Sequence, residues 1–134
     1  MILEVNPDSP IPVFQQIVDQ VIFDIASGGV DPGSLIPSVR DLAQQITVHP
    51  NTVAKAYQKL EERGVLEAKR GRGMEVTSEA PQLCRQQRRD KIREQLRHAL
   101  REAVGSRLPV RDIRQLFNEE LEQANGEPRE GEQP

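Results

Sequence analysis

The side chains of this chain with the clearest chemical potential carry amide, hydroxyl and basic groups, which can form hydrogen bonds and ion pairs with a ligand. Asn51, Thr52 and Gln58 fall on the polar side of a predicted helix. Asn and Gln can pair bidentately with adenine, and a Thr methyl or hydroxyl can touch a base edge. Lys55 and Lys59 follow one helical turn apart, which suits contact with phosphates. The pattern favours nucleic-acid binding, although each side chain taken singly also fits an ordinary solvated helix face.

A second basic group is the run Arg70-Gly71-Arg72-Gly73, which places two guanidinium groups beside two glycines. At the tip of a β-hairpin such a run lets both backbone and Arg side chains approach a narrow minor groove. The same run also fits a simple turn, so the order of the surrounding elements has to decide between the two interpretations.

Composition excludes several other classes of protein. The chain has 134 residues, a net charge of -3, one cysteine and two histidines. Cys84 has no partner for an intramolecular disulfide and is expected to be inert, and His49 and His98 are too far apart for a metal site. No nucleophile–base set or phosphate-binding loop is visible, so we expect neither an enzyme nor a bound cofactor or metal. No apolar run reaches the ~20 residues of a membrane span, and Met1 does not open a signal peptide, so a cytoplasmic protein is expected.

Charge is segregated along the chain despite its acidic total. The first thirty residues contain acids and no bases, whereas bases outnumber acids from residue 40 to residue 101. An acidic protein with a basic middle can still have a nucleic-acid face, although solvated helices fit the charge equally well.

The elements that must position these residues follow from apolar periodicity and breakers. A first helix begins at Pro10 to Pro12 and ends at Gly28, a short second helix opens at a Ser38 capping box, and a third runs from Pro50 to Gly64. Two extended runs, 65–69 and 74–77, then flank the Gly-Arg turn as a hairpin. This order predicts a mainly α fold with a small β-hairpin, a winged helix-turn-helix over residues 1–78.

The rest of the chain predicts a short helical segment over residues 79–124. One long helix covers 81–104 and a second runs from Val110 to Ala124, and residues 125–134 are expected to form a disordered acidic tail. The apolar face of these helices is too short to bury itself alone and predicts a homodimer. Its candidate dimerisation residues are Leu96, Leu100, Val104, Ile113 and Phe117.

Three runs resemble the GntR family of bacterial transcription factors: residues 32–43 (PGSLIPSVRDLA), 48–61 (VHPNTVAKAYQKLE), and 62–67 with 70–73 (ERGVLE and RGRG). Residues 50–57 and the short two-helix C-terminal segment resemble the YtrA subfamily in particular. The resemblance implies that Arg40, which closes a Pro-Ser-x-Arg motif, contacts DNA. It implies the same for residues at the start of the third helix and in the wing, namely His49, Pro50, Asn51, Thr52, Arg70 and Gly71, with Arg72 adjacent.

The sequence also departs from the family pattern. Pro50 stands where many relatives have Arg, so specificity is expected to shift to Asn51, Thr52 and Arg40. His49 replaces the usual Ser or Thr cap and is expected to be a poorer helix cap and a candidate phosphate contact.

Together these features predict a homodimeric, sequence-specific DNA-binding regulator, a repressor on a palindromic operator. The resemblance adds dimerisation through the short C-terminal helices and control of a transporter operon. Any small-molecule effector is expected to lie at the dimer interface or to be absent. The alternative is a winged-helix docking module without specific DNA binding, and the polar outer face of the third helix argues against it.

Overall fold

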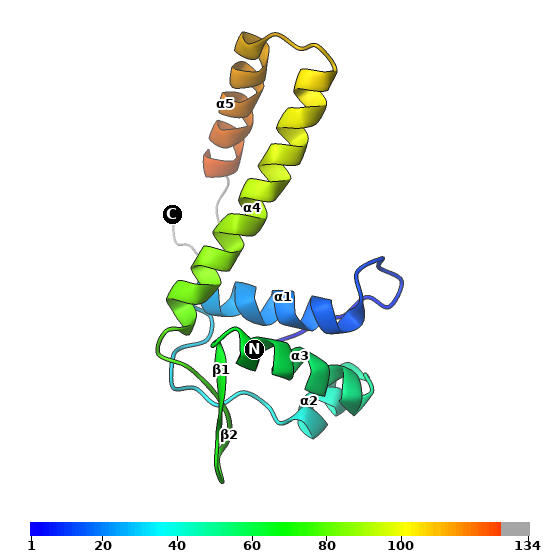
Figure 1. Cartoon of the computed structure of the whole chain (residues 1–134), viewed down its shortest axis with the longest axis vertical. Coiled ribbons are helices and arrows are strands. Elements are labelled where there is room, and N and C mark those ends of the chain that lie inside the picture. The colour runs from blue at the N-terminus through cyan, green and yellow to red at the C-terminus, as the bar shows by residue number, and fades with distance from the viewer. Residues whose placement is uncertain (127–134) are drawn as a thin grey trace. The chain divides into compact units, whose positions relative to one another are not determined.

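The structure, a computed structural model, describes residues 1–126 and divides into two compact units, Met1–Lys91 and the part that begins at Ile92. Both units contain mainly helices, and the first adds an antiparallel two-stranded hairpin (Figure 1). The predicted fold class is therefore confirmed. In chain order the elements are α1 (Val13–Ala26), α2 (Val39–Ile46), α3 (Pro50–Glu62), β1 (Leu66–Lys69), β2 (Gly73–Val76), α4 (Ala80–Gly105) and α5 (Val110–Gly126).

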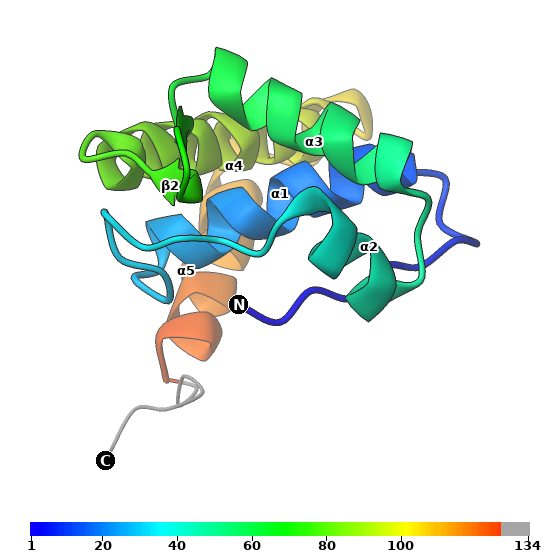
Figure 2. The ribbon, with the colours of Figure 1, turned by 90° about the horizontal axis from the view of Figure 1, so that it is seen from below.

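The core of the first unit lies between α1, α2 and α3. Helix α3 packs against both other helices, as Figure 2 shows from below. Ile17 and Val21 of α1 and Val53 and Leu60 of α3 are fully buried, at the spacing that one face of a helix requires. Burial of such side chains supplies about 1.5–3 kcal/mol each, so this three-helix core fixes the orientation of α3.

The connection between α2 and α3 is tight because one residue takes a left-handed conformation. Thr47, at the C-cap of α2, has φ 54° and ψ 55°, and the Val48 N–H donates to the Ala43 carbonyl at 3.0 Å. Helices often end this way, but the residue is usually glycine. The turn sets α3 across α2, as a helix-turn-helix requires.

The hairpin has a third, unpredicted neighbour. The two strands pair in the register Leu66↔Val76 to Lys69↔Gly73. On the other edge of β2 the Gly33 N–H donates to the Val76 carbonyl at 2.8 Å, and the Ile36 N–H donates to the Met74 carbonyl at 3.0 Å. The sequence predicted a turn at residues 31–34, which forms, but not this pairing, because Gly33 and its neighbours have no strand pattern of their own.

The boundary between the units lies inside α4 rather than at its start. The sequence divided the chain at residues 78 and 79, whereas the first compact unit extends to Lys91. Ala80 and Cys84 are fully buried in the core of the first unit, because their i, i+4 spacing turns both side chains inward.

The second unit contains the rest of α4 and α5, and Leu100 of α4 lines one pocket together with Ile113 and Phe117 of α5. Helix α5 continues two residues beyond the predicted end at Ala124, so Asn125 and Gly126 are helical rather than part of a tail. Both residues have a backbone N–H and can extend the helix. The remainder of the predicted acidic tail lies outside the described residues.

Candidate nucleic-acid interface

The outer face of α3 presents the predicted polar residues to solvent. Val53, Ala56, Tyr57 and Leu60 are buried on the inner side of the helix. On the opposite side Pro50, Asn51, Lys55 and Gln58 are exposed and Thr52 is half-buried. The helix therefore carries one apolar and one polar face, and the polar face contains hydrogen-bonding groups that can reach base edges.

His49 occupies the N-cap position of α3. Its Nδ1 accepts a hydrogen bond from the Asn51 backbone N–H at 3.0 Å, so the imidazole caps the helix. That this cap is weaker than Ser or Thr stays a prediction. Because Nδ1 accepts, Nε2 carries the ring hydrogen and remains available as a donor on an exposed side chain.

Arg40 lies on the first turn of α2 and is exposed. The helix begins as the capping pattern predicted, since Ser38 Oγ accepts from the Asp41 N–H at 3.1 Å. The Tyr57 hydroxyl of α3 donates to the Pro37 carbonyl at 2.7 Å. This part-buried bond connects α3 to the residue just before the cap of α2, the helix that carries Arg40.

The wing tip is the turn between β1 and β2, where Arg70, Gly71 and Arg72 are exposed. The Arg72 N–H donates to the Lys69 carbonyl at 2.9 Å, and Gly71 has φ 78°, a conformation that side chains rarely adopt. In Figure 1 the hairpin leaves the C-terminal end of α3, whereas α2 lies at its N-terminal end, and both are on the side of the first unit away from α1. The structure thus presents the predicted wing residues and the residues at the start of α3 at the two ends of one helix.

The sequence missed the neighbours of two lysines. The Lys55 ammonium lies 4.0 Å from the centroid of the Phe14 ring on α1, a cation–π contact. Lys59 Nζ lies 3.9 Å from a carboxylate oxygen of Glu62 on the same helix. Helical spacing can mark Phe14 as an apolar residue of α1, but it says nothing about which cation lies over its ring.

The five candidate dimerisation residues lie together in the second unit. Leu96 and Leu100 on α4 are 43% and 46% exposed, and Val104 is 64% exposed. On α5 Phe117 is 48% exposed and Ile113 is half-buried. Large apolar side chains at this exposure form a continuous surface that a single chain leaves uncovered.

The described residues hold no group of three or more His, Cys, Asp and Glu that could bind a metal ion. None of the helices in this part of the chain is both long and apolar enough to cross a membrane. Cys84 is fully buried, and burial raises the pKa of its thiol to about 11.

Comparison with known proteins identifies the family. The profile of the gntR family of bacterial regulatory proteins matches residues 14–76. The HTH-type transcriptional repressor YtrA of Bacillus subtilis is 36% identical over 117 residues, which cover 87% of this chain and 90% of that protein. A transcriptional regulator from Oenococcus oeni has a similar structure, with a TM-score of 0.77 and 27% identity over 87% of this chain and 97% of that one.

The chain also resembles a structure solved with DNA. The DNA-binding domain of AraR in complex with an operator has a TM-score of 0.51 and 30% identity, covering 56% of this chain and 96% of that chain. The regulatory-protein profile falls on the segment from α1 to the wing. The chain belongs to the gntR family of bacterial regulatory proteins.

Proposed function

We propose that this DNA-binding regulator is a sequence-specific repressor that binds a palindromic operator as a homodimer. The observation that carries the proposal is the outer face of α3, where Asn51 and Thr52 follow a capped helix start. The exposed Arg40 adds a cation on the first turn of α2, whose preceding residue Pro37 accepts a hydrogen bond from Tyr57 of α3. Buried docking surfaces lack charge and are apolar at their centre, whereas this face is polar and carries cations.

Each predicted side chain has a proposed role on DNA. Asn51, Thr52 and Arg40 would contact base edges in the major groove, with Pro50 packed against the same groove. His49 would donate from Nε2 to a phosphate while its Nδ1 keeps the cap. Lys55 would approach phosphates from its place over Phe14. The wing residues Arg70, Gly71 and Arg72 would lie along the backbone or the minor groove.

The dimer is proposed from the second unit. Its exposed apolar face, built on Leu96, Leu100 and Phe117, needs a partner, and an identical face on a second chain satisfies this by two-fold symmetry. A two-fold dimer predicts an inverted-repeat operator with half-sites about one or two helical turns apart, ~10 or ~20 bp. The likeness to YtrA supports the repressor assignment, and the subfamily resemblance extends the proposal to a transporter operon as the target.

The test is selection of bound fragments from a random duplex pool, repeated at low and near-physiological salt. A palindrome that survives the higher salt is the expected result, because base contacts persist when counterion-linked phosphate contacts weaken. Recovery of unrelated sequences that are lost as salt rises would overturn the proposal and favour the docking module.

A further inference from the structure

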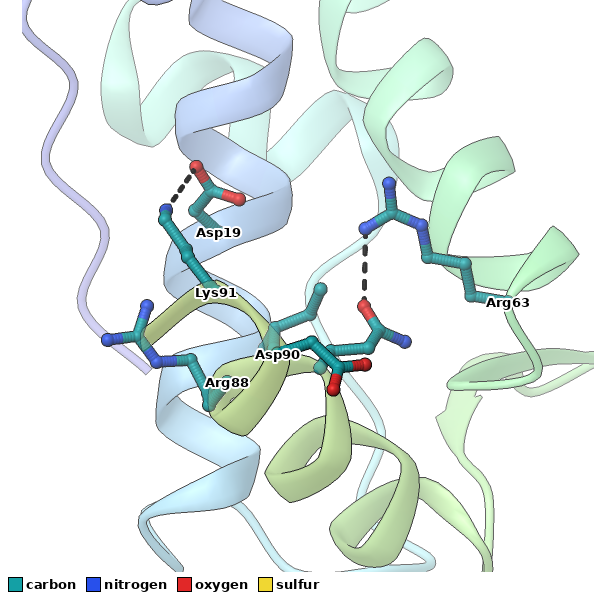
Figure 3. Close-up of a pocket in the computed structure, with 7 residues that line it drawn as sticks. Asp19, Arg63, Arg88, Asp90 and Lys91 are labelled. Carbon is teal, nitrogen blue, oxygen red and sulfur yellow. Dashed lines mark hydrogen bonds and ion pairs between the residues drawn. The ribbon is translucent and has the colours of Figure 1, made fainter. Parts of the chain in front are cut away.

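The first unit contains a pocket that the proposed DNA contacts do not use. It lies between α1, the C-terminal end of α3 and the part of α4 that belongs to this unit, with a volume of about 420 Å³ (Figure 3). Asp19 and Ile22 line it from α1, Arg63 lines it from the C-cap of α3, and Gln87, Asp90 and Lys91 line it from α4. Arg88 completes the lining. The sequence placed any effector at the dimer interface, whereas this pocket lies within one chain.

The two carboxylates of the pocket differ in how far they are engaged. Asp19 Oδ1 accepts from Gln15 Nε2 at 2.8 Å, and its Oδ2 pairs with Lys91 Nζ at 3.3 Å. Asp90 is exposed, and its Oδ1 accepts from Gln86 Nε2 at 3.1 Å. A cationic ligand would therefore have to compete with protein donors for both oxygens of Asp19 and one oxygen of Asp90.

The cationic groups have spare donors. Arg63 Nη1 donates to Gln87 Oε1 at 3.3 Å, which uses one of the five N–H groups of a guanidinium. Arg88 lies over the Phe23 ring at 5.4 Å from its centroid, and within residues 1–126 its guanidinium forms no hydrogen bond or ion pair. Figure 3 shows Arg63 on one side of the pocket and Lys91 on the other. Donors thus line the pocket from the C-cap of α3 and from α4, and Ile22 of α1 adds an apolar side chain to the lining.

We propose that this pocket binds a small oxyanion, the carboxylate or phosphate group of a metabolite, and that its occupancy regulates DNA binding. Arginine forks match the planar oxygens of such groups, and the volume suits a small ligand. An anion held between Arg63 and Lys91 bridges the end of α3 to α4, which continues without interruption into the second unit. The regulatory part of this proposal rests on the proposed function, whereas the binding itself does not.

The experiment follows amide signals of the full chain by NMR during titration with inorganic phosphate and, separately, with succinate, against sodium chloride at equal ionic strength. Saturable shifts at Arg63, Gln87 and Lys91 with either probe are expected. A response to one probe alone identifies the phosphate or the carboxylate as the recognised group. Absence of a saturable response to both probes, or equal shifts at the exposed Arg85 and Arg89, would overturn the site.

Variants of the lining residues test whether the pocket binds an anionic ligand. Arg63→Gln removes a charged donor and should weaken binding of the responsive probe about tenfold. Asp90→Asn keeps an oxygen for Gln86 but removes a negative charge, so it should strengthen binding, by roughly threefold. Arg89→Gln, an adjacent exposed change outside the pocket, is the matched control and should leave the affinity unchanged. Weaker binding in Asp90→Asn would contradict an anion site.

Regulation is measured last, with the operator recovered by selection. The probe should change operator affinity of the unmodified chain at least threefold at constant ionic strength, and this change should be absent in Arg63→Gln. Saturable binding of the probe with unchanged operator affinity would overturn the regulatory role and leave the site. Because probe binding is measured without DNA, failure of the proposed function would be seen separately.

Discussion

Arg40 combines an exposed side chain, which we propose contacts DNA, with a backbone held by the fold. It is exposed on the first turn of α2, and the Ser38 cap and the Tyr57–Pro37 hydrogen bond fix the backbone on which it stands. A long side chain on a rigid base loses less conformational freedom on binding than one on a loop, so it is well placed to read a base.

We expect Arg40→Ala to cost roughly 1–3 kcal/mol of binding to the selected operator and much less on random duplex, since a bidentate base contact would be lost. Fluorescence anisotropy with both duplexes measures the difference. Arg85→Ala, an exposed arginine on α4, serves as the control of equal charge change. Unchanged operator affinity in Arg40→Ala would remove this residue from the interface.

His49 gives a second prediction at the residue scale. Replacement of His49 by Ala removes the acceptor for the Asn51 N–H and should lower the free energy of unfolding by about 1 kcal/mol. His49→Asn restores a side-chain acceptor and should regain most of this loss. Urea unfolding of the three proteins is the measurement, and equal stability of all three would show that the imidazole contributes nothing as a cap.

At the scale of the elements, the α2–α3 turn is held in a conformation that its residue disfavours. Thr47 is β-branched and has φ 54°, where an L-residue loses roughly 1–2 kcal/mol. Thr47→Gly should therefore raise the free energy of unfolding, by up to about 1 kcal/mol after the added flexibility of the unfolded chain is subtracted. Thermal and urea unfolding check this. Ser27→Gly, at the C-cap of α1 with φ -84°, is the control and should bring no gain.

The packing of α3 and α4 predicts how stability depends on pH. Burial raises the pKa of the Cys84 thiol from 9.0 to about 11, and it raises the pKa of the Tyr57 hydroxyl as well. Both groups ionise more readily in the unfolded chain. The contribution of Cys84 is complete below pH 9 and is lost as pH rises to about 11, whereas that of Tyr57 begins to be lost only above pH 10 and continues to fall at higher pH. For Cys84 the loss is on the order of 2 kcal/mol.

Urea unfolding below pH 9 and near pH 11 measures this loss. Cys84→Ala removes one of the two titrating groups and should flatten the decline, although it lowers stability at all pH values by leaving a small cavity. A decline in this window that is as steep in Cys84→Ala as in the unmodified chain would assign it to other groups.

At the scale of the whole molecule, we propose that the exposed apolar face of the second unit makes the protein a dimer. Leu100→Glu places a charge among the five candidate dimerisation residues and should shift the protein from dimer to monomer. Sedimentation equilibrium reports the mass, and circular dichroism checks that the helices persist. Gln95→Glu makes the same charge change at another exposed position on α4 and should leave the dimer intact.

A monomeric Leu100→Glu protein should also lose most of its affinity for a two-half-site operator while it retains weak binding to a single half-site, because the two sites no longer act together. If the unmodified chain sediments as a monomer, the palindromic-operator proposal fails with it.

The sequence by itself determined the order and type of the elements. Proline and glycine mark helix ends locally, and apolar residues at helical spacing indicate which face of each helix is buried, so α1 to α3, the hairpin and the polar face of α3 could all be predicted. The Gly-Arg run marked the wing turn locally, whereas Arg40 was singled out by the resemblance to the GntR family, and its DNA contact stays a prediction.

Only the tertiary structure decided which residues of different helices and strands contact one another. The hydrogen bond from the Asn51 N–H to the His49 imidazole could not be predicted, because average preferences for cap residues do not include the geometry of one side chain. The Lys55–Phe14 contact, the pairing of residues 33–36 with β2, the extension of the first unit to Lys91 and the charged pocket all join segments far apart in the chain. Their energies depend on distance and burial in three dimensions, and neither quantity is encoded in the local spacing of residues.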